Sequence, residues 1–138
     1  MRVLVFDTET TGLPQTKILN PDTLHLWPTI VQFSFIIYDL SLNEIILSND
    51  HVIKIPNDIS ISEESSKIHG ITNEICSSKG VLMEDVLDEF FCCLKNVDCI
   101  VGHNVSFDKS MIVVELLRII YNKNYSYVVT KKYKNHLN

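Results

Sequence analysis

Two acidic residues separated by a single threonine follow the first apolar segment of the chain. Asp7 and Glu9 come directly after "VLVF" (residues 3–6), and the segment "TTGL" follows them. If a strand extends this far, its alternation places both carboxylates on the same face. Two carboxylates that close repel each other unless a cation lies between them, and all-oxygen ligands suit Mg²⁺ or Mn²⁺. Taken alone, however, a strand that ends in a polar turn explains this segment slightly better than a metal site does.

A third acidic residue occurs much later, in "VGHNVSFDK" (residues 101–109). This pattern predicts a short strand followed by a helix, with Asp108 about one turn into the helix. Because ligands gather at the carboxyl ends of parallel strands, Asp7 and Asp108 can converge on one crevice. Asp108 can also be explained as an acid that the helix dipole favours near a helix amino terminus, and Asn104 as a helix cap.

The segment "SKIHGIT" (residues 66–72) lies between these two acidic regions. It is typical of a helix that stops at Gly70, followed by a new helix capped by Thr72. Taken alone, His69 within it is more readily explained as a hydrogen-bonded polar residue than as a ligand.

The elements that must position these residues begin with strands. Residues 2–6 predict a short buried strand, and residues 30–40 predict a second strand with one well-buried face. Residues 44–55 predict a third strand with an irregularity at Asn49-Asp50. We expect these three strands to be antiparallel. Residues 13–29 contain three prolines and are expected to form a loop rather than a helix.

The second half of the chain changes to helical periodicity. A short helix is expected between Ser62 and Gly70, with a single further turn after Thr72. Apolar spacing predicts an amphipathic helix over 83–97, and a short buried strand over 98–102 and a helix over 106–121 follow. Past Asn122 the chain is polar, and residues 126–129 are too few to place. Because there is no repeat and no linker, we expect residues 1–138 to form a single α/β domain.

The composition argues against several classes of protein. The net charge of −5 argues against a generic basic protein that coats nucleic acid, but not against an enzyme that holds nucleic acid through metal ions. The four cysteines lack C-x-x-C spacing and a nearby histidine, so no zinc site is expected. Neither a signal peptide nor a membrane-spanning apolar run is visible. The expected location is therefore intracellular, in the cytoplasm or the nucleus, with no membrane partner.

Taken together, "FDTETTGL", "KIHGIT" and "GHNVSFD" resemble, in this order and at this spacing, the DnaQ-like 3′–5′ exonucleases of the DEDD class. This family includes the proofreading exonuclease subunits of bacterial DNA polymerase III, and "HGIT" is typical of its histidine subclass. The resemblance extends from residue 1 to about residue 121. It implies a ribonuclease H-like fold, in which a mixed sheet begins with three antiparallel strands and is flanked by helices.

The resemblance also implies a reaction and its cofactors. The expected function is hydrolysis of 3′-terminal phosphodiester bonds of DNA or RNA, which releases nucleoside monophosphates in proofreading or repair. Two divalent cations, Mg²⁺ or Mn²⁺, about 3.5–4 Å apart, would activate the attacking water and stabilise the leaving oxygen. Asp7 would bridge both ions, Glu9 would hold the ion that carries the water, and Asp108 would complete the cluster, partly through water. The implied partners are a single-stranded 3′ end and a DNA polymerase.

A set of substrate-binding residues is implied around the three acids. Leu13 would pack against the terminal base or sugar, while Asn104 and Phe107 would orient the 3′ end. Backbone groups of the turn after the first strand would face the terminal nucleotide, and the "HGI" residues would line the substrate groove. The implied substrate-binding residues are Thr8, Thr10, Thr11, Gly12, Leu13, His69, Gly70, Ile71, Asn104 and Phe107.

The chain departs from the family in one respect. The family's third motif, a His or Tyr shortly before a final Asp on a later helix, has no counterpart, since no acidic residue follows Glu115 and His136 lies two residues from the end. We therefore expect a domain that is incomplete at its carboxyl end, with weak or no nuclease activity. One alternative is a non-catalytic nucleic-acid- or polymerase-binding module of the same fold. Another is an unrelated α/β domain whose acids are caps and surface residues.

Overall fold

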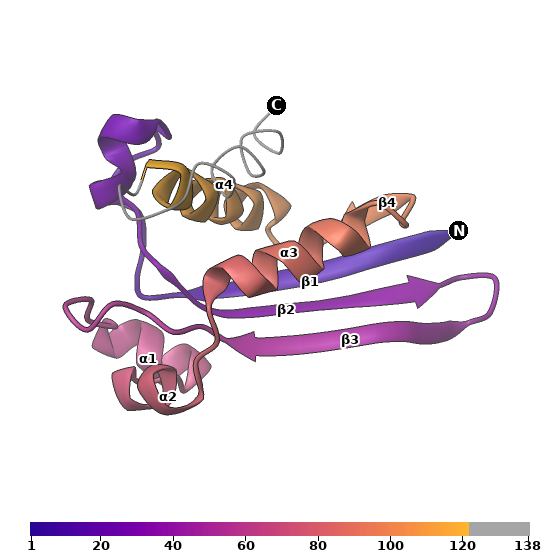
Figure 1. The fold of residues 1–138 in the computed structure, drawn as a ribbon, viewed down its shortest axis with the longest axis horizontal. Coiled ribbons are helices and arrows are strands. Elements are labelled where there is room, and N and C mark those ends of the chain that lie inside the picture. The colour runs from indigo at the N-terminus through magenta and orange to yellow at the C-terminus, as the bar shows by residue number, and fades with distance from the viewer. Residues whose placement is uncertain (122–138) are drawn as a thin grey trace.

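The computed structural model describes residues 1–121, which form a mixed sheet with helices on one face and at one end (Figure 1). The strands are β1 (Arg2–Thr10), β2 (Ile30–Asp39), β3 (Glu44–Val52) and β4 (Cys99–Val101), in the order β3-β2-β1-β4. β1, β2 and β3 are successively antiparallel, and β4 is parallel to β1. This is the arrangement expected from the sequence. His136 and residues 126–129 lie outside the described residues.

The first strand is longer than its apolar residues predicted. β1 continues to Thr10, because Thr8 and Thr10 extend its inward-facing row with polar side chains that are nonetheless buried. A register shift between Glu9 and Thr10 then ends its regular pairing with β2. The longer strand carries Asp7 and Glu9 within it, on the face opposite the buried row.

Two expectations about the other strands are wrong. The irregularity of β3 lies opposite the step from Ile37 to Tyr38, not at Asn49-Asp50, where pairing stays regular. The Asp50 carboxylate accepts hydrogen bonds from Ser34 Oγ (2.7 Å) and from a second side chain of β2, and these bonds fix the register at this point. β4 is not buried: Ile100 and Val101 are 41% and 45% exposed, because β4 lies at an edge of the described sheet.

The segment expected to be a loop contains a short 3₁₀-helix, η1 (Pro21–Leu26). Pro21 occupies its first position, where a missing N–H costs nothing. The Asn20 side chain accepts hydrogen bonds from the amides of Asp22 and Thr23, and the Thr23 hydroxyl accepts one from the Asn20 amide. This reciprocal cap explains why a proline-containing segment is helical here.

The α-helices agree closely with the sequence analysis. They are α1 (Glu63–His69), α2 (Asn73–Lys79), α3 (Met83–Leu94) and α4 (Val105–Tyr121). Ser62 caps α1, and α1 ends at Gly70, whose φ of 73° is a left-handed conformation that glycine adopts without strain. Thr72 caps α2, which extends for seven residues rather than a single turn.

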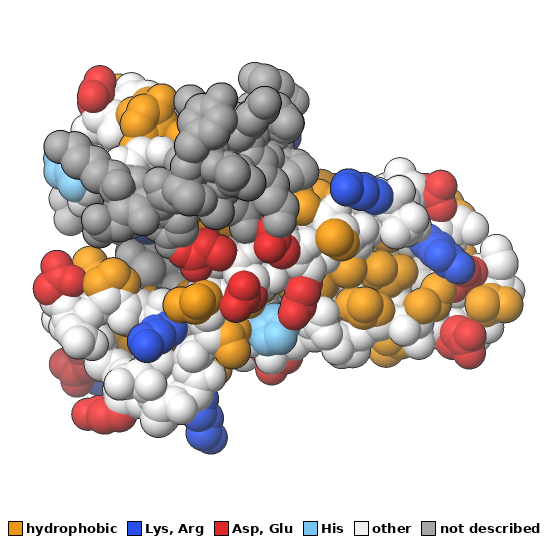
Figure 2. All heavy atoms as spheres, viewed as in Figure 1, with side chains coloured by type: hydrophobic (Ala, Val, Ile, Leu, Met, Phe, Trp, Pro, Cys, Tyr) orange, Lys and Arg blue, Asp and Glu red, His pale blue; other side chains and the backbone are white. Residues whose placement is uncertain are grey.

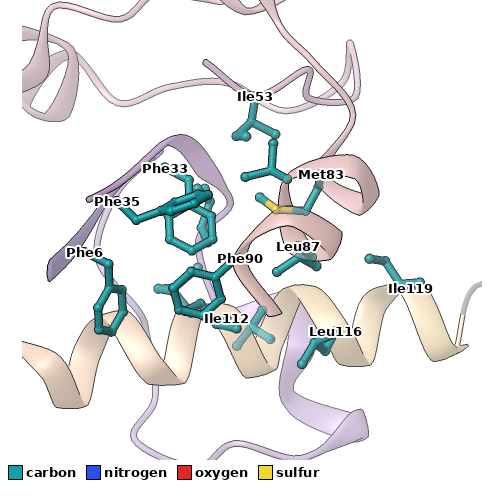
Figure 3. Packing of buried hydrophobic residues seen from close by; sticks show 14 of the residues in the cluster. Phe6, Phe33, Phe35, Ile53, Met83, Leu87, Phe90, Ile112, Leu116 and Ile119 are labelled. Atoms are coloured by element: carbon teal, nitrogen blue, oxygen red, sulfur yellow. The ribbon is translucent and has the colours of Figure 1, made fainter. Parts of the chain in front are cut away.

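The main hydrophobic core lies between the sheet and the helices α3 and α4. Phe90 of α3 points into a group of aromatic rings from β1 and β2, with ring centroids 5.4 Å from Phe6, 4.9 Å from Phe33 and 5.5 Å from Phe35 (Figure 3). α4 adds further buried side chains, among them Leu116. α4 is thus held against β1 along the strand that carries the first two acids.

Acidic and hydrophobic side chains occupy separate areas of the face shown in Figure 2. Acidic side chains gather over α3, and hydrophobic side chains gather towards the end of the sheet where β2 turns into β3. Ile45 and Ile46 at that end are 56% and 44% exposed. Among residues 1–121, no helix is both long enough and apolar enough to cross a lipid bilayer.

Candidate active site

Asp7 and Glu9 lie on the same face of β1, two residues apart, as the strand alternation requires. Neither side chain has a hydrogen bond within residues 1–121 that would offset its charge. Partial burial and the nearby Asp108 carboxylate raise the pKa of Asp7, and His103 partly offsets this. Burial, then the Asp7 carboxylate, raise the pKa of Glu9, while His69 lowers it and Asp108 raises it further.

Asp108 reaches the other two acids from the first turn of α4. β4 pairs with β1 only as far as Val5. Further along β1, the Thr8 amide has no strand partner on this side within residues 1–121 and donates to Asp108 instead. Its Oδ1 accepts hydrogen bonds from the Thr8 hydroxyl (2.6 Å) and the Thr8 amide (3.2 Å). The carboxylate is only 2% exposed, so these bonds are strong restraints on its position.

The close approach of α4 to β1 depends on Gly102, which links β4 to α4. A Cβ atom at this position would lie 3.1 Å from the Phe6 carbonyl oxygen and 3.2 Å from Val105 Cγ2. A larger residue would push the start of α4 away from β1, and with it Asp108.

The three carboxylates lie within electrostatic reach of one another, and their role as a joint catalytic and metal site stays a prediction. Within residues 1–121, no group of three or more His, Cys, Asp or Glu side chains is arranged to hold a metal ion. The donor chemistry nevertheless fits a hard divalent cation, because all of the donors are carboxylate oxygens. Burial first, and then repulsion from a neighbouring carboxylate, raises the pKa values of Asp7 and Glu9, and a bound cation would relieve that repulsion.

The turn after β1 uses most of its polar groups to hold itself in place. The Thr10 hydroxyl donates to the Gly12 carbonyl (2.8 Å), and the Thr11 amide donates to the Thr29 carbonyl (2.9 Å). The Thr11 hydroxyl accepts from the Thr29 amide (3.0 Å). Thr8, Thr10 and Thr11 are each less than a tenth exposed. Their side chains, and the Thr11 amide, are therefore engaged within the protein, and their predicted contact with a substrate stays a prediction.

Gly12 and Leu13 are the part of the turn that faces outward. Their amides donate no hydrogen bond within residues 1–121, and the Leu13 side chain is 85% exposed. An apolar side chain this exposed, shortly after Glu9 in the sequence, is free to make the predicted contact to a terminal base or sugar.

Two hydrogen bonds to the backbone fix the ring of His69. Its Nδ1 accepts a hydrogen bond from the Ile71 amide (3.1 Å), so its Nε2 carries the proton and donates to the Thr10 carbonyl (3.0 Å). His69 thus joins the end of α1 to the end of β1, while remaining half-buried beside Glu9.

The remaining predicted residues differ in how they reach the surface. Ile71 is only 5% exposed and packs in a second core cluster, so its side chain does not line a groove. Asn104 is exposed and its side-chain oxygen accepts from the Phe107 amide (3.4 Å), which makes it the cap of α4. Phe107 packs at the margin of the main core, and Gly70 ends α1. Only Asn104, of these four, presents a polar side chain to solvent.

Sequence reasoning missed two residues that hold the turn. Thr29 accepts a hydrogen bond from the Thr11 amide and donates one to the Thr11 hydroxyl. The Ser62 amide donates to the Thr11 carbonyl (2.9 Å). Both contacts join residues far apart in the sequence, so no local pattern could have indicated them.

Comparisons with known proteins identify the family of the chain. The family model described as "Exonuclease" matches residues 4–135, so the chain belongs to this exonuclease family. DNA polymerase III subunit epsilon of Buchnera aphidicola subsp. Acyrthosiphon pisum is 31% identical over 115 residues, which are 83% of this chain and 44% of that protein. The same subunit from Buchnera aphidicola subsp. Schizaphis graminum is 33% identical over 111 residues, which are 80% of this chain and 43% of that protein. The chain thus spans less than half the length of these relatives.

Solved structures of exonuclease I share the fold. The enzyme from Methylocaldum szegediense has a TM-score of 0.65 at 21% identity, covering 86% of this chain and 23% of its own. Exonuclease I of E. coli in complex with a dA16 oligonucleotide has a TM-score of 0.60 at 24% identity, covering 86% of this chain and 24% of its own. The predicted ribonuclease H-like fold and exonuclease family are therefore confirmed. Members of this family generally use divalent metal ions.

The Thr8–Asp108 contact can be tested by removing a single hydroxyl. Thr8→Val keeps the shape of the side chain but removes the donor to a buried carboxylate, which should lower the free energy of unfolding by about 1.5–3 kcal/mol. Thr8→Ser keeps the hydroxyl and should lose much less. Urea unfolding followed by circular dichroism measures both variants, and equal losses for Val and Ser would contradict the contact.

The partial burial of Asp7, and then its repulsion from Asp108, predict that a variant without this charge is more stable than the native chain. An acid whose pKa is raised by folding costs stability as the pH rises from its unfolded pKa through its folded pKa. Asp7→Asn should therefore raise the urea midpoint at pH 7 without divalent cations, and the gain should vanish as the pH falls below the usual aspartate pKa. Glu44→Gln, at the other end of the sheet, is the control and should change little. A lower midpoint for Asp7→Asn at pH 7 would contradict this account.

Proposed function

We propose that this chain is a metal-dependent 3′–5′ exonuclease domain that acts on the 3′-terminal phosphodiester bond of a single nucleic-acid strand. The observation that carries the proposal is the mutual electrostatic influence of Asp7, Glu9 and Asp108, where the strand that carries the first two leads directly into an outward-facing turn with Leu13 exposed. The products would be nucleoside monophosphates. Membership of the exonuclease family supports the reaction class.

Asp7 and Glu9 would hold the metal directly, because no hydrogen bond within residues 1–121 occupies their oxygens. Asp108 has one oxygen committed to Thr8, so it would act with its other oxygen or through water. Divalent cations, Mg²⁺ or Mn²⁺, when bound, supply charge neutralisation and a nucleophilic water at neutral pH. The chain's own part is to fix the three carboxylates against their mutual repulsion.

The terminal nucleotide would lie over the turn. The amides of Gly12 and Leu13 can donate to it, and the Leu13 side chain offers an apolar surface for the base or sugar. His69 would act mainly by fixing the Thr10 carbonyl and so the direction of the turn. Asn104 lies at the amino-terminal end of α4, where a helix favours negative charge such as a phosphate.

The relatives named as polymerase subunits support a role beside a DNA polymerase, as a proofreading domain. One observation favours a second candidate, a module that binds a 3′ end without cutting it. No acidic residue lies among residues 116–138, where the family resemblance implies a final Asp. We propose that this form binds metal and a 3′ end but releases nucleotides slowly or not at all.

Metal binding is the first test. Calorimetry with Mn²⁺ should give saturable binding to the native chain, because a cation relieves the repulsion between Asp7 and Glu9. The double variant Asp7→Asn/Glu9→Gln should lose this binding, while Glu44→Gln should keep it. The proposal is wrong if the double variant binds Mn²⁺ as the native chain does.

Catalysis is the second test. The 138-residue chain with Mn²⁺ and a 3′-labelled single strand should release little or no mononucleotide, while still binding the strand in a fluorescence anisotropy titration. An Asp7→Ala variant gives the background rate. Rapid release that Asp7→Ala abolishes would show that the fourth carboxylate is dispensable in this chain. Absence of strand binding with Mn²⁺ would overturn the proposed function itself.

A further inference from the structure

One of only two arginines in the chain, Arg118, makes an unusual set of contacts in the last turns of α4. Its guanidinium donates to three backbone carbonyls of the segment that follows Thr23. Nη2 donates to Leu24 (3.0 Å) and Trp27 (2.8 Å), and Nη1 donates to Pro28 (2.9 Å). Figure 1 shows η1 beside this end of α4. Arg118 therefore fastens the whole loop between η1 and β2 to the helix.

Glu115, one turn earlier, completes the contact. Its Oε1 accepts from Arg118 Nη1 (3.0 Å) and from the Ile30 amide (3.1 Å), where β2 begins. Burial raises the pKa of Glu115, and the Arg118 charge and the Ile30 amide offset this. The carboxylate is only 7% exposed, so the pair is sheltered from solvent rather than a weak surface ion pair.

The loop that this pair holds is bonded in turn to the substrate-facing turn. Thr29 bonds to the amide and the hydroxyl of Thr11, and the Leu26 carbonyl accepts from the Gln15 amide (2.8 Å). These bonds lie on either side of Leu13, whose side chain is exposed. The position of Leu13 is thus set from both sides by a loop that Arg118 and Glu115 fix.

The same helix carries Asp108 at its other end. Asp108 is bonded to Thr8 of β1, and Arg118 lies ten residues further along α4. A helix is stiff over this length, so it sets a fixed separation between the acidic cluster and the loop. An exonuclease that removes one terminal nucleotide needs that separation, because the scissile phosphate must meet the acids while the terminal base or sugar meets the turn.

We propose that Arg118 and Glu115 are positioning residues for the 3′-terminal nucleotide, acting through the Thr29–Thr11 bonds on the turn that carries Leu13. The inference rests on the proposed function, since it assigns the turn to the terminal nucleotide. The geometry demands arginine: its planar guanidinium reaches carbonyls on two sides at once, whereas a lysine ammonium is a single point of donation.

Arg118→Lys is the main test variant, because it keeps the positive charge beside Glu115 but cannot hold all three carbonyls. With Mn²⁺ present, Arg118→Lys should bind thymidine 5′-monophosphate about tenfold more weakly than the native chain does. A loss of this size is typical of residues that act through a shared contact. The Mn²⁺ affinity of this variant should not change, because Asp7, Glu9 and Asp108 are untouched. The control is Ile37→Val or Ile37→Ala, in the core at the far end of the sheet, whichever matches the urea midpoint of Arg118→Lys.

A second variant follows the contact to the turn. Thr11→Val removes the acceptor for the Thr29 amide and should weaken nucleotide binding as Arg118→Lys does, while Thr11→Ser restores it. The two changes should be non-additive in a double-mutant cycle, because they break the same connection. Additive effects would mean that Arg118 does not act through Thr11, and would overturn the proposal.

Amide hydrogen exchange separates the possible failures. In Arg118→Lys, the Thr11, Thr29 and Ile30 amides should exchange faster, while strand amides such as that of Phe6 should not. Native exchange rates, or nucleotide binding equal to that of the Ile37 control, would overturn the positioning role. If the native chain binds Mn²⁺ but no nucleotide, the proposed function fails, and faster exchange alone would make Arg118 a structural residue only.

Discussion

The hydrogen bonds from the Thr8 amide and hydroxyl to the Asp108 carboxylate are the contact on which the site depends. They join residues 100 positions apart, the first strand and the last described helix. A buried carboxylate without such donors would be costly, so the contact both stabilises the fold and fixes the third acid. The packing of α4 on β1, and the close approach at Gly102, serve the same geometry.

Around this contact, the polar groups of the site divide into two sets. The hydroxyls of Thr8, Thr10 and Thr11 are buried and each makes a hydrogen bond within the protein. Both nitrogens of the His69 ring do so as well. Asp7, Glu9 and the amides of Gly12 and Leu13 are left facing outward. The buried polar groups are therefore held by hydrogen bonds within the protein, whereas the outward-facing groups are free to contact a ligand. This is the expected division of a pre-organised site.

The sequence predicted the parts of this site that depend on local periodicity. Strand alternation placed Asp7 and Glu9 on one face, and the cap at Ser62 placed the start of α1. The sequence did not predict the hydrogen bonds of Thr8 and Thr11, because their partners, Asp108 and Thr29, lie 100 and 18 positions away in the sequence. β4 was expected to be buried because its residues are apolar, but burial depends on which neighbours cover an edge strand.

The charge of the chain constrains how such a site can work. The net charge is −5. Three of the carboxylates that contribute to it lie in the candidate site, where a polyanion would have to approach. This negative charge opposes the attraction between basic side chains and phosphates that usually supplies much of the affinity for nucleic acid. Under the proposed function, a bound divalent cation would reverse the local charge, so metal binding and strand binding would depend on each other. The repulsion among Asp7, Glu9 and Asp108 would then couple the two.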